Sequence, residues 1–152
     1  YTRIGLCLYE STSARVDNLW LAGALLIQKL HPQTPLEVFL FNDHTLKDIA
    51  TWVADRKIEV VLSDNQTSLH ALQRQGMQVP GDVNYATLNW IRSESEIAGI
   101  NQCPDSIGAA VIDLLIAQVQ RGERGIPDMP INSMVAGIWS NGPSLRNRPQ
   151  SS

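Results

Sequence analysis

Short apolar runs alternate along the chain with segments in which apolar residues recur every three or four positions. Four runs, at 2–9, 36–41, 58–62 and 83–88, are rich in aliphatic, aromatic and β-branched residues and predict buried strands. Between the first two, apolar residues recur at helical spacing, which predicts a helix with one buried face: Val16, Leu19, Trp20, Gly23, Leu26, Ile27 and Leu30. A shorter helix should carry Leu46, Ile49, Trp52 and Val53 on one side.

The stretch 57–90 has the order of a complete strand–helix–strand unit. Its first strand ends in the polar turn Ser63-Asp64-Asn65, which suits the start of a helix. The helix should end at Gly76, because glycine readily adopts the left-handed conformation that closes many helices. Pro80 and Gly81 then predict a turn before the next strand. Such a unit is typical of a parallel sheet.

The last third of the chain predicts one long helix and one more strand. Asp105 or Ser106 can cap a helix that runs to about Arg121, and a final strand is expected at 133–139. One stripe of that helix is aliphatic: Ile107, Val111, Leu114 and Leu115. Strands that alternate with helices predict an α/β fold, a three-layer parallel sheet flanked by helices of Rossmann-like or flavodoxin-like type.

Composition restricts the function more than it identifies it. Apolar residues make up 43% and charged residues 18% of the 152, which is typical of a packed globular chain. The formal net charge of −3 gives no basic field for nucleic acid, and no apolar run reaches membrane-spanning length. Three scattered histidines, two distant cysteines and the lack of any phosphate-loop or nucleophile motif predict no metal, no cofactor and no enzyme activity.

Polar residues follow all four predicted strands of the first 90 residues. The strand ends read Tyr9-Glu10-Ser11, Phe41-Asn42-Asp43, Ser63-Asp64-Asn65 and Leu88-Asn89-Trp90. Ligands of open α/β sheets bind outside the carboxyl ends of the strands. These four strand ends therefore form a candidate ligand site.

Four stretches, LSDN, LQRQGMQVPGDV, YATLNW and AGINQCPDSIGAAVIDLL, carry a resemblance that covers nearly the whole chain. In this order they resemble the effector domain of LacI/GalR-family transcription regulators. The resemblance implies a lobe of the type I periplasmic-binding-protein fold and a small, sugar-like effector held between two lobes. It also implies a cytoplasmic homodimer that binds DNA through a helix-turn-helix upstream of this chain.

The same resemblance implies a division of the chain and an origin for it. Residues 1–98 would form the second lobe, 99–132 a crossover and a helix that belongs to the first lobe, and 133–152 a return strand and tail. A chain that starts at Tyr1, directly before a strand, is expected to be the C-terminal part of a longer regulator. Without the first lobe, the aliphatic stripe on the long helix needs another copy, a swapped segment or the rest of the protein to cover it.

Five ligand-binding residues follow from the resemblance, and each has a structural alternative. Arg15 matches an arginine that grips sugars or purines, although it could be a surface residue in the first turn of a helix, where its charge opposes the helix dipole. Asn89 replaces an aspartate that accepts hydrogen bonds from ligand hydroxyls, and Trp90 could stack on a sugar ring or serve as a packing anchor. Asp64 and Asn42 match or adjoin contact positions, but both residue types also cap helices and form turns.

Three other classes of protein share the alternation of strands and helices. A solute-binding protein of similar architecture would need an export signal. A flavodoxin-like module would need a glycine in the loop after the first strand, where Glu10-Ser11-Thr12-Ser13-Ala14 has only hydroxyls. A receiver domain would need paired acids there and a lysine after the last strand, yet only Glu10 is acidic and no lysine follows residue 57.

Overall fold

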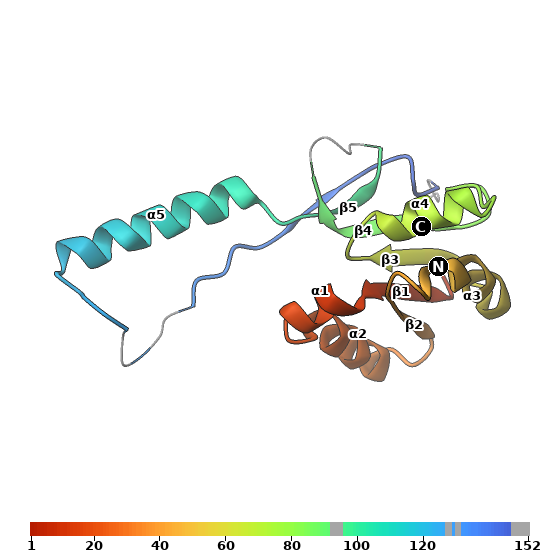
Figure 1. Ribbon diagram of the computed structural model, residues 1–152, viewed down its shortest axis with the longest axis horizontal. Coiled ribbons are helices and arrows are strands. Elements are labelled where there is room, and N and C mark those ends of the chain that lie inside the picture. The colour runs from red at the N-terminus through yellow and green to blue at the C-terminus, as the bar shows by residue number, and fades with distance from the viewer. Residues whose placement is uncertain (92–95, 127–128, 130–131, 147–152) are drawn as a thin grey trace, which may run out of the picture.

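A six-stranded sheet forms the centre of the computed structural model, which describes residues 1–91, 96–126, 129 and 132–146 (Figure 1). The strand order is β2-β1-β3-β4-β5-β6. The first five strands pair in parallel: β1 (Ile4–Tyr9), β2 (Leu36–Phe41), β3 (Val60–Ser63), β4 (Asn84–Trp90) and β5 (Ala98–Asn101). The first four confirm the strands predicted for a parallel sheet, whereas β5 was not predicted. The last strand, β6 (Ile138–Ser140), pairs antiparallel with β5 and is much shorter than the predicted 133–139.

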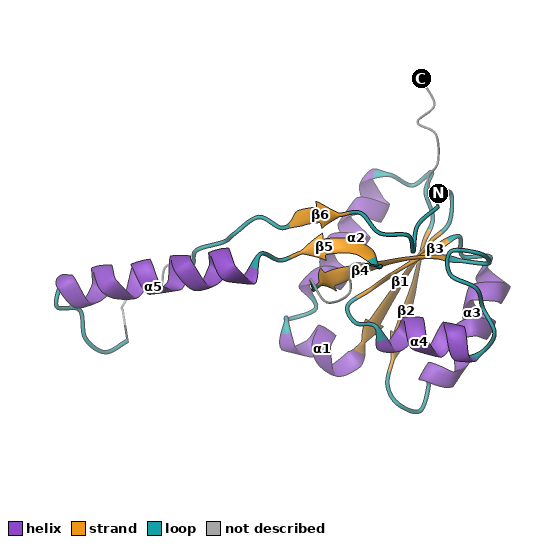
Figure 2. Ribbon diagram, turned by 90° about the horizontal axis from the view of Figure 1, so that it is seen from above, coloured by secondary structure: helices purple, strands orange, loops and turns teal. Residues whose placement is uncertain are grey.

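Helices cover both faces of this sheet. The crossover from β1 to β2 contains α1 (Glu10–Arg15) and α2 (Leu19–Leu30). The later crossovers, which run in the other direction across the sheet, contain η1 (Leu46–Asp48), α3 (Ile49–Arg56) and α4 (Thr67–Arg74). Right-handed crossovers in opposite directions place their helices on opposite faces. Figure 2 shows α2 and α4 on the two sides of the strands, as a three-layer α/β fold requires.

The hydrophobic core lies mainly between the sheet and the helices α3 and α4. Ile49 and Val53 of α3 and Leu69 and Leu72 of α4 are buried, as their spacing predicts. Phe39 stacks on Trp52 with ring centroids 5.1 Å apart and extends this core to the edge strand β2. The unit 57–90 therefore has the predicted order of strand, helix and strand. Gly76 has a positive φ, as predicted, with a value of 90°.

The prediction of one helix with a buried face on the other side of the sheet is wrong in two respects. The helix is broken into α1 and α2 by Asp17 and Asn18, which both have positive φ, a conformation that Asp and Asn tolerate better than most residues. No residue of α2 is buried, and four of the apolar residues expected inside are exposed: Leu19, Leu26, Ile27 and Leu30. An apolar groove of about 350 Å³ separates α2 from the sheet, with Leu6, Leu62 and Leu88 among its lining residues.

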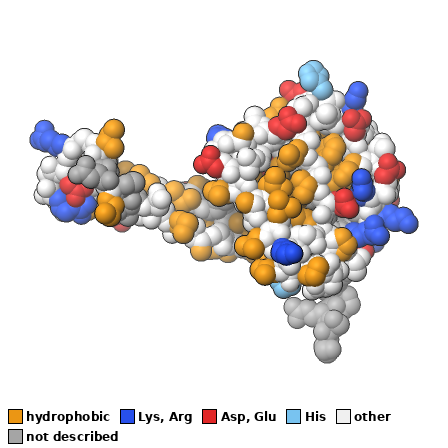
Figure 3. Space-filling view, turned by 90° about the horizontal axis from the view of Figure 1, so that it is seen from below, with side chains coloured by type: hydrophobic (Ala, Val, Ile, Leu, Met, Phe, Trp, Pro, Cys, Tyr) orange, Lys and Arg blue, Asp and Glu red, His pale blue; other side chains and the backbone are white. Residues whose placement is uncertain are grey.

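The long helix α5 (Pro104–Gln120) stands away from the sheet on two extended connections (Figures 1 and 2). It begins one residue before the predicted caps, and Cys103 precedes it with a positive φ of 54° and no side-chain cap bond. None of its residues is buried, and apolar side chains are exposed on several sides, among them Val111, Ile112, Leu115, Ile116 and Val119. Figure 3 shows apolar side chains along this arm and on the body of the molecule.

Among the described residues, none of the helices is both long enough and apolar enough to cross a membrane.

Candidate functional site

Strand register brings the predicted polar strand ends to one edge of the sheet. Tyr9 at the end of β1 pairs with Phe41 at the end of β2, and Cys7 pairs with Ser63 of β3. Ser63 in turn pairs with Thr87 of β4, so Asn89 and Trp90 extend past the end of β3. The residues that directly follow these strands therefore line a common edge.

Asp64 is a deeply buried ionisable residue of this edge, with an exposed fraction of 2%. Its Oδ1 accepts a hydrogen bond from the backbone N–H of Tyr9 at 3.1 Å, which links the ends of β3 and β1. Its Oδ2 is buried and has no hydrogen-bond partner among the described residues. Burial raises the pKa of this carboxyl, and the hydrogen bond from Tyr9 opposes that shift, as do smaller contributions from the Asp64 backbone and from the hydroxyls of Thr12 and Ser63. Asp64 is not a cap of α4, so the edge contains one unused, buried acceptor.

Asn42 forms the turn that follows β2. Its Oδ1 accepts hydrogen bonds from the N–H groups of His44 at 3.0 Å and Thr45 at 3.2 Å. Its Nδ2 donates to Oε2 of Glu10 at 3.1 Å. The interpretation of Asn42 as a turn-forming residue is therefore confirmed, while a ligand contact stays a prediction. Thr45 does not cap the next helix with its side chain, because its hydroxyl accepts from the N–H of Asn42 instead.

Tyr9 joins two of the strand ends by its side chain. Its hydroxyl donates to Oδ1 of Asp43 at 2.8 Å, and this bond raises the pKa of the tyrosine. Its ring packs edge-on against Phe41 with centroids 5.2 Å apart. Sequence reasoning placed Tyr9, Glu10 and Asp43 at strand ends but not among the ligand-binding residues. The sequence signal that could have identified them was the aromatic residue Tyr9 at the end of an aliphatic strand.

Asn89 and Trp90 lie at the end of β4, where the pairing with β5 is irregular. The register shifts between Thr87 and Trp90, and the N–H of Asn89 donates to the hydroxyl of Thr87 at 3.1 Å. The Asn89 side chain is exposed. Trp90 is half-buried, and its indole Nε1 is a buried donor with no hydrogen-bond partner among the described residues. The edge thus has an unused donor as well as the unused acceptor of Asp64.

Arg15 lies at the end of α1 and not in the first turn of a helix. Its positive charge therefore suits the carbonyl end of α1, and the expected conflict with the helix dipole is absent. The side chain is exposed and has no hydrogen bond or ion pair with another described residue. Five residues of helix separate it from Glu10, a rise of about 8 Å. The structure does not bring Arg15 into contact with Asn42 or Asp64.

Helix α1 begins directly after β1, which bears on the flavodoxin-like alternative. Glu10 is already helical, and no side chain caps the first turn. A phosphate-binding loop needs several non-helical residues between strand and helix whose N–H groups face the phosphate. The chain has no such residues at this position.

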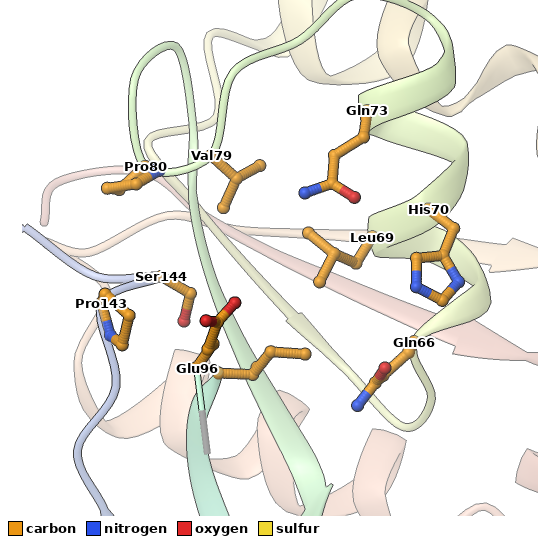
Figure 4. Close-up of a pocket in the computed structure, with 10 residues that line it drawn as sticks. Gln66, Leu69, His70, Gln73, Val79, Pro80, Glu96, Pro143 and Ser144 are labelled. Carbon is orange, nitrogen blue, oxygen red and sulfur yellow. The ribbon is translucent and has the colours of Figure 1, made fainter. Parts of the chain in front are cut away.

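A hollow of about 510 Å³ lies away from the strand ends, beside α4 and the segment that follows β6 (Figure 4). His70 and Gln73 approach it from α4 and Gln66 from the position before that helix, and Pro143 and Ser144 lie opposite them. Nε2 of Gln66 is a buried donor without a partner among the described residues. None of the five predicted ligand-binding residues lines this hollow.

No cluster of three or more potential metal ligands occurs in the described part of the chain. Cys7 is fully buried in β1, and burial raises the pKa of its thiol far above the ordinary value. That thiol remains protonated and packs as a small apolar group, as the sequence predicts.

No family model matches the sequence, and no curated protein resembles it significantly. Solved structures share its fold. An uncharacterized protein from Actinobacillus succinogenes is 14% identical with a TM-score of 0.67, and the match covers 94% of this chain and 55% of that one. A LacI family transcriptional regulator from Enterococcus faecium with bound ribose is 18% identical with a TM-score of 0.56, and the match covers 82% of this chain and 50% of that one.

A LacI family transcriptional regulator from Arthrobacter sp. FB24 in complex with lactose is also similar. It is 14% identical with a TM-score of 0.56, and the match covers 84% of this chain and 51% of that one. At these identities the likeness shows the fold, which is the fold of LacI family regulators and the one predicted from the sequence. The chain spans about half the length of the structures it matches.

Proposed function

We propose that this chain is the C-terminal part of the effector-binding domain of a LacI/GalR-like transcription regulator. The observation that carries the proposal is the buried, unused acceptor of Asp64 at the carboxyl edge of a sheet with this fold. The sugar-bound regulators of the same fold support it, as does the order of motifs along nearly the whole sequence. The role is sensing and not catalysis.

The proposed effector is a small sugar-like molecule. A ligand hydroxyl could donate to Oδ2 of Asp64 and another could accept from Nε1 of Trp90, which would satisfy both buried groups. The exposed Asn89 can donate and accept further hydrogen bonds. Arg15, which no described side chain engages, could donate two parallel hydrogen bonds to vicinal hydroxyls from the rim of the site. Asn42 would hold the turn around the site.

In this proposal residues 1–98 form one lobe and the effector lies between it and a second lobe. Residues 99–132 form the crossover and a helix of that second lobe, and 133–152 return to the first. The position of α5 away from the sheet and its exposed apolar side chains support this division. Effector binding favours one arrangement of the lobes only if the effector has a higher affinity for it. In a cytoplasmic homodimer that arrangement would set the spacing of two DNA-binding helix-turn-helix domains upstream of this chain.

The test is a ligand screen on the full-length protein. We expect at least one mono- or disaccharide to raise its thermal unfolding midpoint, because a ligand that binds only the folded state stabilises it. The same sugar should change the affinity of the protein for its own promoter DNA in a gel-shift titration. Binding of a sugar without any effect on DNA would favour a solute-binding protein. A screen in which no sugar binds would contradict the proposal.

Replacement of Arg15 tests the site itself. Arg15→Ala should abolish the response to the sugar and change the free energy of unfolding by less than about 1 kcal/mol, because the side chain is exposed and unpaired. Isothermal titration and chemical unfolding measure the two quantities. Arg74→Ala, an exposed arginine in the last turn of α4, is the matched control and should bind the sugar normally. An Arg15→Ala protein that responds like the wild type would exclude this residue from the site.

A further inference from the structure

Acidic groups at the carboxyl edge of the sheet set the charge that an effector meets. Glu10 follows β1, Asp43 follows β2 and Asp64 follows β3. Hydrogen bonds connect these strand ends: Asn42 donates to Glu10, and Tyr9 donates through its hydroxyl to Asp43 and through its backbone N–H to Asp64. Strand register and these three bonds bring the carboxylates of three crossovers to one edge.

Neutral donors hold all three carboxylates. Within the described residues, none of the three forms an ion pair, and the ion pairs of the chain join other residues, Arg56 with Glu37 and Arg121 with Glu123. An amide, a phenol or a backbone N–H orients a carboxylate without cancelling its charge. Arg15, at the end of α1, is the one cation among the five residues assigned to the site.

Asp64 is buried, so this edge differs from a solvated acidic surface. The residue is 2% exposed, and its Oδ2 has no partner among the described residues. Buried polar atoms in folded proteins are nearly always paired, so an orphan at a ligand-binding edge points to a missing donor. A ligand hydroxyl would supply that donor, whereas a phosphate or carboxylate would place a second anion beside this oxygen.

We infer that the site selects uncharged polyhydroxy effectors and rejects phosphorylated or carboxylated sugars, because its strand ends carry three carboxylates, those of Glu10, Asp43 and Asp64, against one cation, Arg15. This inference rests on the proposed function and adds the charge class of the effector. Lobe closure strengthens the selection, since electrostatic repulsion is less screened where water is excluded.

The experiment is isothermal titration of the full-length protein, which measures its affinity for each member of several pairs of uncharged and anionic sugars. The pairs are galactose and galacturonate, ribose and ribose phosphate, and glucose and glucose phosphate, extended to the anionic counterpart of any other sugar found to bind. We expect the anionic member of a binding pair to bind at least about tenfold more weakly than its parent. The ratio should shrink as the salt concentration rises, because salt screens the exposed Glu10 and Asp43.

The variant Glu10→Gln/Asp43→Asn assigns the effect to the carboxylates. Each replacement keeps an acceptor oxygen for its present donor, so the bonds from Asn42 and Tyr9 can persist while the charge is removed. We expect the discrimination to fall to less than about threefold. Asp55→Asn/Asp82→Asn removes the same charge at exposed positions away from the edge and should keep the wild-type ratio.

Two results would overturn the inference and leave the proposed function standing. One is an anionic sugar that binds as tightly as its parent or more tightly, and the other is discrimination that the Glu10→Gln/Asp43→Asn variant does not reduce. If neither member of any pair binds, the proposed function fails together with the inference. A preference for the uncharged member that the variant removes supports both.

Discussion

At the scale of single residues, Asp64 shows how a residue of a candidate ligand site can lower the stability of the folded chain. A carboxylate that is 2% exposed, with one hydrogen bond and an unpaired oxygen, loses hydration that the protein only partly replaces. The raised pKa of this carboxyl has the same origin, since burial disfavours the charged form. A structural role alone would favour asparagine or serine at the end of β3. The cost is consistent with a residue retained for a ligand.

The sign of this effect predicts a pH dependence. A carboxyl whose pKa is raised by folding binds more protons in the native state, so its contribution to stability falls as the pH rises from its ordinary pKa through the raised value. Asp64→Asn removes the charge and keeps an acceptor for Tyr9. The free energy of unfolding of the variant, relative to the wild type, should therefore increase with pH over that interval. Urea unfolding at a series of pH values measures it.

The control for this prediction is Asp55→Asn, because Asp55 is exposed on α3. Its stability relative to the wild type should not change over the same pH interval. A parallel dependence in both variants, or none in Asp64→Asn, would contradict the assignment of the effect to the buried carboxyl.

At the scale of elements, the unit from β3 to β4 is held by a buried hydroxyl network in addition to its apolar core. The Tyr85 hydroxyl of β4 donates to the carbonyl of Asn65 at 2.6 Å and lies 2.8 Å from the Ser68 hydroxyl of α4. Ser68 also donates to the hydroxyl of Ser63 at the end of β3, at 2.8 Å. These bonds fix the turn that carries Asp64, so the network positions the candidate site.

Removal of the tyrosine hydroxyl should therefore destabilise the unit. Tyr85 is fully buried, and Tyr85→Phe leaves the Asn65 carbonyl without this donor, which should cost about 1–3 kcal/mol of unfolding free energy. Ser68→Ala should cost a similar amount, and the double variant less than the sum, because the two hydroxyls share one network. Equilibrium unfolding of the three variants gives the coupling energy. Additive losses would show that the hydroxyls act independently.

At the scale of the whole molecule, apolar surface is distributed in an unusual way. Helix α5 exposes apolar residues on several sides and α2 buries none of its residues, while α3 and α4 are packed as their patterns predict. A helix that is apolar all round is normally buried on more than one side. The proposed function supplies the missing cover of α5 as the other lobe of the effector domain.

Without that lobe, this chain should associate through α5. Residues 1–152 produced alone should form dimers or larger species in sedimentation experiments, because exposed aliphatic side chains gain on the order of 1.5–3 kcal/mol each when buried. Leu115→Asp should reduce the association, since Leu115 is 52% exposed and contributes little to the fold of the single chain. Gln120→Asp adds the same charge on α5 without removing an apolar side chain and should associate normally. An unchanged mass for Leu115→Asp would exclude α5 as the interface.

The sequence by itself determined the first four strands, their place in a parallel sheet and the edge that holds the candidate site, but it did not reveal β5 and placed the last strand too early. Short β-branched runs, Gly76 and the polar residues after each strand are local signals, because each reflects the conformation and burial of a few neighbouring residues. The same signals gave the α3 and α4 faces correctly, since both helices pack on the sheet of their own chain.

Only the tertiary structure decided which apolar faces are covered and which polar atoms are paired. The stripe on α2 has the same spacing as a buried face, yet spacing does not reveal whether a surface packs against it, and α2 stands off behind an apolar groove. Likewise, nothing local distinguishes Asp64, which is buried with a free oxygen, from Asn42, whose amide is fully used by a turn and by Glu10. Burial and pairing depend on residues that are distant in sequence, and these decide which strand-end residue is available to a ligand.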